Sequence, residues 1–257
     1  MREDEDAYGS AAARYYDEVY EQLRDGSGDI EFYRSLARET GGPVLELGCG
    51  SGRVLLPIAR DGLVCRGLDA SPAMLERFRR KDPPGNLQLA LGRMQNFDLG
   101  AERFSLVYSA FRAFQHLLTV GEQLDCLAAV RRHLAPRGLF AFDVFAPLLH
   151  RIAILEEPEA EDARFRVDGG EVVRFVSVRR DPAAQVMDVT FRYEWRARGG
   201  SVENEIVRTR MRYFFRYELE HLLARAGFAS VRFFGGFDRR PYDYVSGEMI
   251  AVAAAEA

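Results

Sequence analysis

Val44-Leu45-Glu46-Leu47-Gly48-Cys49-Gly50-Ser51-Gly52 is the stretch that decides how this chain folds. A short apolar run leads into three alternating glycines, and a helical pattern follows from Arg53 to Arg60. Glycine lets the backbone approach a ligand closely, and the first turn of a helix offers N–H groups without intrahelical partners. The stretch therefore predicts a strand, a tight loop and a helix that together hold a nucleotide-like ligand.

The spacing of the glycines separates two kinds of cofactor site. A dinucleotide-binding loop has the pattern G-x-G-x-x-G, and counting from Gly48 and Gly50 puts Arg53 where the third glycine would stand. The chain instead has E-x-G-x-G-x-G from Glu46 to Gly52. Backbone atoms of such a loop could hold an amino-acid moiety that carries an ammonium and a carboxylate, with no pyrophosphate. A nucleotide-dependent oxidoreductase is disfavoured but stays an alternative, as does a non-catalytic protein that retains the fold.

Strands and helices alternate on the C-terminal side of the loop. Further strands are expected at Leu63–Leu68, Leu87–Leu91, Phe104–Ser109 and Leu139–Val144, and a long helix at Val120–Leu134, closed by Pro136 and Gly138. Ser71 and Pro72 have the residue types of an N-cap and a first helical position. This alternation is typical of an α/β fold in which a doubly wound, Rossmann-like parallel sheet has helices on both faces.

Two helices are expected before the loop. In the first, over Ala11–Leu23, tyrosines and aliphatic residues recur at helical spacing, and Asp17, Glu18 and Glu21 fall on the other side. The second covers Ile30–Glu39 and ends at Gly41-Gly42, where glycine can adopt the left-handed cap conformation.

The pattern changes to antiparallel strands between residues 163 and 214. Apolar and polar residues alternate strictly from Met187 to Arg196, which indicates a half-buried strand. With Val172–Val178 before it and Ile206–Phe214 after it, we expect a three-stranded meander. The aromatic row Phe191, Tyr193 and Trp195 is interpreted as core or a dimer contact, and the row Arg208, Arg210 and Arg212 as a solvated face or protection of an edge strand. A helix at Tyr217–Ala226 capped by Gly227, and strands at Val231–Phe234 and Met249–Ala253, complete the chain.

Asp69 ends the second expected strand, where this architecture places the ribose of a bound ligand. A carboxylate there can accept hydrogen bonds from both sugar hydroxyls. Val44–Gly52, Gly67–Ser71 and Leu134–Gly138 together resemble the class I S-adenosylmethionine-dependent methyltransferases, over about Tyr8 to Val144. The resemblance implies a seven-stranded sheet with its last strand antiparallel and S-adenosylmethionine as the cofactor. The cofactor would lie across the carboxyl ends of the first, second and fourth strands.

Within that class, Tyr8, Tyr16-Asp17 and Gln115-His116-Leu117, together with the β insert, are similar to the amino-sugar N-methyltransferases. This finer resemblance implies that Tyr8 and Tyr16 close over the cofactor and that His116 faces the methyl acceptor. Many members have an acidic residue before the methionine after the third strand, whereas this chain has Gly92-Arg93-Met94, so the backbone at Met94 is the expected contact to the adenine. The expected cofactor-binding residues are Tyr16, Glu46, Gly48, Cys49, Gly50, Gly52, Asp69, Ala70, Met94 and Ser109, and the expected catalytic residues are His116 and Tyr8.

The expected chemistry is an in-line displacement on a sulfonium, which needs the acceptor to be held close and at the right angle. His116 can act as a base toward that acceptor, or it can be a structural histidine. Tyr8, Tyr16 and Tyr20 can border the positively charged sulfonium, or they can pack the helix onto the sheet. We expect one domain over residues 1–257, with an N-terminal helical lid at 1–40 and the antiparallel β insert at 151–215.

Composition limits the partners. A formal net charge of -4 and a pI near 5.7 give no net attraction to nucleic acid, so a small-molecule acceptor is expected. Cys49, Cys65 and Cys126 have no metal or redox spacing, and we expect buried, reduced thiols. No metal site is expected from His133, His150 and His221. The chain shows neither a signal peptide nor a membrane-spanning apolar run, so a cytoplasmic location without membrane contact is expected, with a homodimer as an option. Whether nitrogen, oxygen or carbon is methylated stays open.

Overall fold

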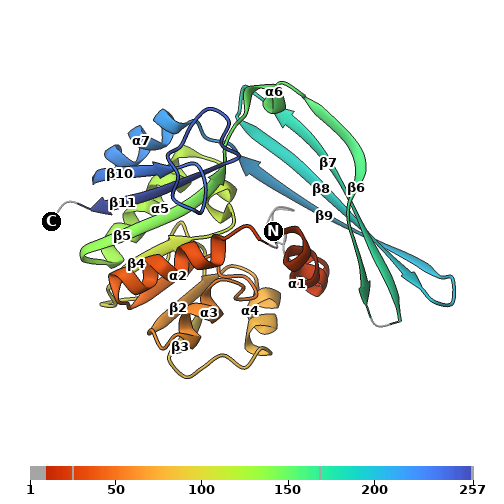
Figure 1. The fold of residues 1–257 in the computed structure, drawn as a ribbon, viewed down its shortest axis with the longest axis horizontal. Helices are drawn as coiled ribbons and strands as arrows, with labels where there is room; N and C mark the ends of the chain where they lie inside the picture. Colours follow the sequence, from red (N-terminus) through yellow and green to blue (C-terminus); the bar gives the residue numbers. More distant parts are fainter. Residues whose placement is uncertain (1–9, 25, 168, 256–257) are drawn as a thin grey trace.

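The computed structural model describes residues 10–24, 26–167 and 169–255, and its strands form two separate sheets (Figure 1). The larger sheet has seven strands in the order β10-β11-β5-β4-β1-β2-β3. Its strands are β1 (Val44–Leu47), β2 (Cys65–Asp69), β3 (Leu87–Leu91), β4 (Phe104–Ser109), β5 (Leu134–Phe145), β10 (Phe228–Phe234) and β11 (Glu248–Ala255). The strands β1 to β5 pair in parallel, and β11 runs antiparallel to both β5 and β10. The expected Rossmann-like sheet with an antiparallel last strand is confirmed.

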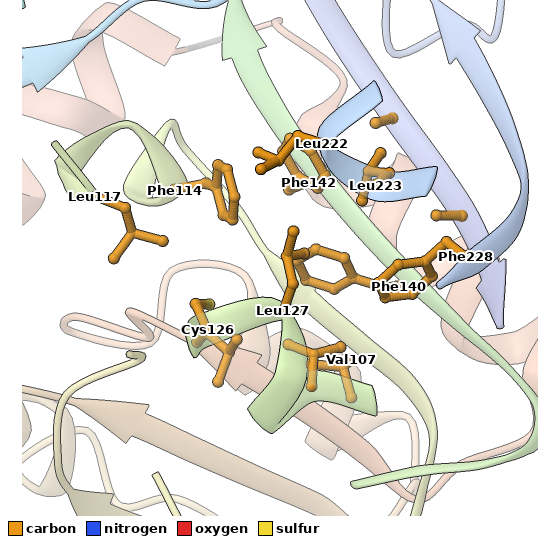
Figure 2. Close-up of a cluster of buried hydrophobic side chains, with 14 of the residues drawn as sticks. Val107, Phe114, Leu117, Cys126, Leu127, Phe140, Phe142, Leu222, Leu223 and Phe228 are labelled. Atoms are coloured by element: carbon orange, nitrogen blue, oxygen red, sulfur yellow. The ribbon is translucent and has the colours of Figure 1, made fainter. Parts of the chain in front are cut away.

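Helices cover both faces of this sheet. The helices are α1 (Ser10–Arg24), α2 (Asp29–Thr40), α3 (Leu55–Arg60), α4 (Pro72–Arg79), the 3-10 helix η2 (Ala113–His116), α5 (Val120–His133), α6 (Leu149–Ile152) and α7 (Arg216–Arg225). On one face, Phe140 and Phe142 of β5 pack against Leu127 of α5 and Leu222 of α7 (Figure 2). On the other face, α2, α3 and α4 pack around Tyr108 of β4. The sheet is therefore buried on both sides, as a parallel sheet requires.

Local signals set several helix ends. The hydroxyl of Ser71 accepts a hydrogen bond from the Met74 N–H, and Pro72 occupies the first turn of α4, so the expected N-cap is confirmed. Gly41 caps α2 in the left-handed conformation, with a φ of 81°. Helix α5 ends at His133, one residue before the expected Leu134, but Pro136 and Gly138 do not close it, because the chain passes directly into β5 and both residues lie within that strand.

The second sheet has four strands and not the expected three. Its order is β6-β7-β8-β9, with β6 at Glu156–Val167, β7 at Gly170–Asp181, β8 at Val186–Ala197 and β9 at Val202–Arg212. The strand missed from the sequence is β6, which pairs along one edge only and is mostly exposed. Arg208 and Arg210 of the opposite edge strand β9 are exposed, as expected, whereas Arg212 is half-buried and donates to the carbonyl of Leu118 and to Glu218.

Helix α1 lies against the second sheet and joins it to the rest of the molecule (Figure 1). Tyr15 stacks on Tyr193 with ring centroids 5.9 Å apart, and Val19 is fully buried in the same cluster. Phe191 and Trp195 pack against this cluster, so the aromatic row of β8 is core, as expected. In the part of the chain that the structure describes, no helix is both long and apolar enough to cross a membrane.

Candidate active site

A pocket opens at the carboxyl ends of β1, β2 and β4, where the sequence places the ligand. Five separate segments contribute to its wall: α1, the glycine-rich loop, the end of β2 with the start of α4, the segment after β3, and the segment from the end of β4 through η2. The lining residues are Tyr16, Glu46, Gly48, Cys49, Gly50, Arg53, Val54, Asp69, Ala70, Ser71, Met74, Gly92, Arg93, Met94, Gln95, Ala110, Phe111, Ala113, His116 and Leu117.

The glycines of the loop serve two different purposes. Gly48 has a φ of 72°, and a Cβ there would lie 2.9 Å from the Cβ of Ala113, so glycine lets η2 approach the loop. Gly52 has a φ of 83°, and its Cβ would lie 2.3 Å from the ring of Phe78. Gly52 does not line the pocket, so its place in the pattern is explained by the packing of α4.

Asp69 links the loop to the second strand. Its Oδ2 accepts a hydrogen bond from the Gly50 N–H at 2.7 Å, and its Oδ1 accepts one from the Ser71 N–H at 2.8 Å. Burial raises the pKa of Asp69, and the backbone hydrogen bonds from Ser71 and Gly50 counteract that rise. An ionised carboxylate has about four acceptor positions, so Asp69 keeps acceptor capacity for a ligand hydroxyl beside the bonds that it accepts from the backbone.

Glu46 lies at the end of β1, beneath the glycine-rich loop. Its side chain is 3% exposed, and it accepts a hydrogen bond from the hydroxyl of Tyr108 at 3.1 Å. Burial raises the pKa of Glu46 well above its ordinary value, and the hydrogen bond from Tyr108 and the charge of Arg53 only partly oppose this. A buried carboxyl at the pocket wall is well suited to meet a positively charged group on a ligand.

Arg53 adds a positive charge to the pocket wall. Its guanidinium forms two hydrogen bonds with Asp29, at 2.6 and 3.1 Å, and lies over the ring of Phe111 with 5.2 Å to the centroid. Asp29 is 2% exposed, so the pair is shielded from water. In the sequence, Arg53 served only to exclude a dinucleotide site. Its ion pair with Asp29 was missed because Asp29 lies in α2, 24 residues before it in the chain.

The loop after β4 is held in place by a buried carboxylate. Asp143 of β5 accepts hydrogen bonds from the N–H groups of Phe111 and Arg112, at 2.8 and 3.0 Å, and from the hydroxyl of Tyr33 at 2.7 Å. Phe111 and Arg112 both have positive φ, at 55° and 64°. Because non-glycine residues adopt this conformation at a cost, the bonds from Asp143 stabilise the turn that points Phe111 into the pocket.

His116 lies in η2, between the glycine-rich loop and the second sheet. Its Nδ1 is 3.1 Å from the carbonyl oxygen of Arg210 in β9. The neighbouring Gln115 is fully buried, donates to the carbonyl of Arg212 at 2.8 Å and accepts from the N–H of Phe145 at 3.1 Å. Burial lowers the pKa of His116, and the hydrogen bond to Arg210 partly opposes this. The second sheet therefore positions the histidine.

The structure brings together most of the residues expected at the site. The ones that line the pocket are Tyr16, Glu46, Gly48, Cys49, Gly50, Asp69, Ala70, Met94 and His116. Ser109 is fully buried and does not line the pocket, and Tyr8 lies outside the described residues.

Other residues of the site were not found by sequence reasoning. Arg53, Phe111 and Gln95 line the pocket, and Asp143 supports it from behind. The left-handed pair at Phe111 has no glycine to mark it, so no sequence signal was available for that turn.

The cysteines and the histidines outside the pocket have mainly structural surroundings. All three cysteines are buried and free, as expected. Within the described ranges, no group of three histidine, cysteine, aspartate or glutamate side chains is arranged to hold a metal ion. His133 has a structural role, since its Nε2 accepts from the N–H of Leu99 and its Nδ1 lies 2.8 Å from the carbonyl oxygen of Ala129.

Comparison with known proteins identifies the kind of site. Residues 44–138 match a family model described as a methyltransferase domain. The solved structure of the CcbJ methyltransferase from Streptomyces caelestis is 30% identical, with a TM-score of 0.79 over 99% of this chain and 100% of that one. CalS10 from Micromonospora echinaspora, an amino pentose methyltransferase solved with S-adenosylmethionine bound, is 25% identical, with a TM-score of 0.70 over 91% of this chain and 93% of that one.

Matches to curated sequences are shorter. An uncharacterised methyltransferase of Synechocystis is 32% identical over 107 residues, which are 42% of this chain and 49% of that protein. A cypemycin N-terminal methyltransferase of Streptomyces is 26% identical over 144 residues, 56% of this chain and 58% of that protein. The chain thus spans about half the length of the curated relatives it matches.

The residues of the pocket fit S-adenosylmethionine. Asp69 offers acceptors for ribose hydroxyls, and Glu46 offers a carboxyl for the ammonium of the methionine moiety. The position that a Cβ at Gly50 would occupy has no atom within 4 Å, which leaves room for a ligand against the loop. Met74 and Met94 offer apolar contacts to an adenine ring. With this fit and a 30% identical relative matched along almost all of both chains, the chain belongs to the class I S-adenosylmethionine-dependent methyltransferases.

Proposed function

We propose that this protein transfers a methyl group from S-adenosylmethionine to a nitrogen or oxygen atom of a small molecule, with His116 as the base that faces the acceptor. The observation that carries the proposal is the placement of His116 in the wall of the cofactor pocket, with Nδ1 held by the Arg210 carbonyl. S-adenosylmethionine, when bound, supplies an electrophilic methyl group next to its sulfonium.

The hydrogen bond to Arg210 determines what the imidazole can do. A carbonyl oxygen only accepts, so Nδ1 carries the proton in the neutral ring and Nε2 carries the lone pair. Burial keeps the pKa of His116 below its ordinary value of 6.5, so the ring is neutral at pH 7. A neutral imidazole with a fixed tautomer can accept a proton from an ammonium or hydroxyl group of an acceptor.

Aromatic rings support the same chemistry. Tyr16 lies 4.6 Å from Tyr20, and Tyr20 lies 4.7 Å from Phe111, measured between ring centroids. Tyr16 and Phe111 line the pocket. Aromatic faces attract a nearby cation, which favours binding of the sulfonium. They also exclude water, which protects the sulfonium from hydrolysis.

The relatives support a small-molecule acceptor. CalS10 is named as an amino pentose methyltransferase, and KedS8 from Streptoalloteichus, which shares the fold at 22% identity, as a sugar N-methyltransferase. An amine on a small polar molecule such as an aminosugar is therefore the first class of acceptor to test. The protein would be incubated with S-adenosylmethionine and a panel of amino and hydroxylated sugars, and methylated products would be detected by mass.

His116→Ala tests the role of the base on whichever acceptor is found. We expect kcat to fall about 100-fold, in the range typical of a lost general base, while the affinity for S-adenosylmethionine measured by calorimetry stays unchanged. In the wild type, kcat/KM should rise with pH along a limb that lies below pH 6.5, because protonation of His116 removes the base. This limb should be absent from the variant. Full activity in His116→Ala would show that the histidine is structural.

A further inference from the structure

The carboxylate of Asp17 connects helix α1 to the glycine-rich loop and to the C-terminal end of α4. It accepts hydrogen bonds from the hydroxyl of Ser51 in the glycine-rich loop, from Nε of Arg77 in α4 at 2.6 Å, and from Nζ of Lys81 at 2.9 Å. Ser51 is 1% exposed, and the side chain of Asp17 is 24% exposed. Three donors from the glycine-rich loop and the end of α4 therefore converge on one partly buried carboxylate of α1.

The same face of α1 makes further contacts with α4. Arg77 donates from Nη2 to Glu18 at 2.8 Å and from Nη1 to the carbonyl of Arg14 at 2.8 Å. Negative charges of α1 thus meet positive charges at the end of α4. The sequence pattern placed Asp17 and Glu18 on a polar side of the helix, and the structure shows that this side is a contact between helices.

Asp17 is adjacent in the chain to a residue of the pocket wall. Tyr16 lines the pocket, and its ring contacts Tyr20, which in turn contacts Phe111. Neighbouring residues of one helix turn move together, so the bonds of Asp17 also set how closely Tyr16 approaches the cofactor. Burial raises the pKa of Asp17, but the bonds from Ser51, Lys81 and Arg77 outweigh it and lower the pKa, which keeps the carboxylate ionised.

Two glycines precede helix α2 on the side of the chain that leads from α1. Gly26 and Gly28 lie between α1 and α2 and have φ values of 70° and 79°. Helix α2 is fixed, since Tyr33 is fully buried and donates to Asp143. A short glycine-containing segment beside a fixed helix can absorb the dihedral changes of a hinge.

We propose that Asp17 is a positioning residue that fastens α1 to the glycine-rich loop and thereby limits the exchange of the cofactor and its demethylated product. Release of the ligand requires Tyr16 to withdraw from the pocket, and this withdrawal breaks the bonds of Asp17 to Ser51, Arg77 and Lys81. The proposal rests on the cofactor of the family and depends neither on the acceptor nor on His116.

The test measures ligand release in Asp17→Asn, which keeps the size of the side chain and removes its charge. The probe is S-adenosylhomocysteine, whose dissociation rate is measured by displacement with excess S-adenosylmethionine. We expect dissociation to be about tenfold faster or more, since one hydrogen bond to a charged group is worth about a tenfold change in an equilibrium constant. Lys81→Met should change the rate in the same direction. Hydrogen exchange in residues 10–24 should become faster in both variants.

Asp61→Asn is the matched control. Asp61 is also 24% exposed and accepts hydrogen bonds from two arginines, Arg34 and Arg38, but it does not line the pocket. This control should release S-adenosylhomocysteine at the wild-type rate. An unchanged rate in Asp17→Asn, or an equal acceleration in Asp61→Asn, would overturn the proposal. Unfolding midpoints of all three variants separate faster release from a general loss of stability.

Discussion

At position 46 a carboxyl group lies inside the protein, with the hydroxyl of Tyr108 as its hydrogen-bonding partner. Because burial raises its pKa in the folded state above the ordinary value of 4.5, the folded protein binds a proton more tightly than the unfolded chain does. Each tenfold difference in proton affinity amounts to about 1.4 kcal/mol. The stability that Glu46 contributes is fully present below pH 4.5 and is lost as the pH rises toward the pKa of the folded state.

Glu46→Gln should therefore stabilise the cofactor-free protein at pH 7 relative to the wild type, and the difference should shrink as the pH falls toward 4.5. The same change should weaken the binding of S-adenosylmethionine, because the amide carries no negative charge for the ammonium. Chemical denaturation over a pH series measures the first effect, and calorimetry measures the second. A stability difference that does not vary with pH would contradict the raised pKa of Glu46.

Residues of the site could be predicted where they lie close together in the sequence. Glu46, Gly48, Gly50 and Asp69 follow from one loop and the end of the next strand, and all of them line the pocket. Asp143 could not be predicted, because it acts through backbone N–H groups that lie more than 30 residues away. A side chain that stabilises a turn elsewhere in the chain leaves no recognisable pattern in the sequence around that turn.

At the scale of elements, the contact between the glycine-rich loop and α4 gives a test of packing. Gly52→Ala would place a Cβ 2.3 Å from the ring of Phe78, at a backbone φ of 83°. We expect a loss of about 3 kcal/mol or more, from steric overlap and backbone strain together. For a protein of this size the midpoint of thermal unfolding should fall by roughly 10 °C.

Gly62→Ala separates the two causes. Gly62 has a φ of 93°, and a Cβ there would have no atom within 4 Å, so this variant carries the backbone strain without the overlap. We expect it to cost only about 1 kcal/mol. Equal losses in the two variants would mean that Phe78 moves aside at little cost.

The elements that sequence reasoning missed have physical explanations. The first half of strand β6 contains Pro158 and a run of acidic residues, so a strand-like composition does not mark it, and apolar residues alternate only in its second half, at Ala163, Phe165 and Val167. Pro136 was taken as a helix terminator, but it lies near the start of β5, where the helix has already ended at His133. Periodicity predicts elements that bury one face along their length, and β6 does so only over its last few residues, which pack against the cluster of Tyr15 and Val19.

At the scale of the whole molecule, the two sheets should unfold together. The chain has a single tryptophan, Trp195, which lies in the second sheet and packs against the cluster that contains Tyr15 of α1. Gln115 joins the second sheet to β5 through Arg212 and Phe145. Because these contacts tie both sheets to one site, we expect one cooperative transition.

The measurement follows thermal unfolding by tryptophan emission and by far-ultraviolet circular dichroism. The two midpoints should coincide, and S-adenosylmethionine should raise both by the same amount. Separate midpoints, with only one of them shifted by the cofactor, would show that the second sheet folds as an independent unit.

The tether of His116 and Gln115 is made chiefly of main-chain carbonyls of β9, and the hydroxyl of Thr209, 3.4 Å from Nδ1 of His116, is the side-chain contact beside them. Substitutions along β9 can therefore reshape the surface offered to an acceptor without releasing the histidine. A one-residue insertion in β9 upstream of Arg210 is a different matter, since it shifts the strand register and turns alternate carbonyls the other way. On the proposed role of His116 as the base, acceptor preference can diverge by point substitution in the second sheet, while the proposed chemistry constrains the length of β9.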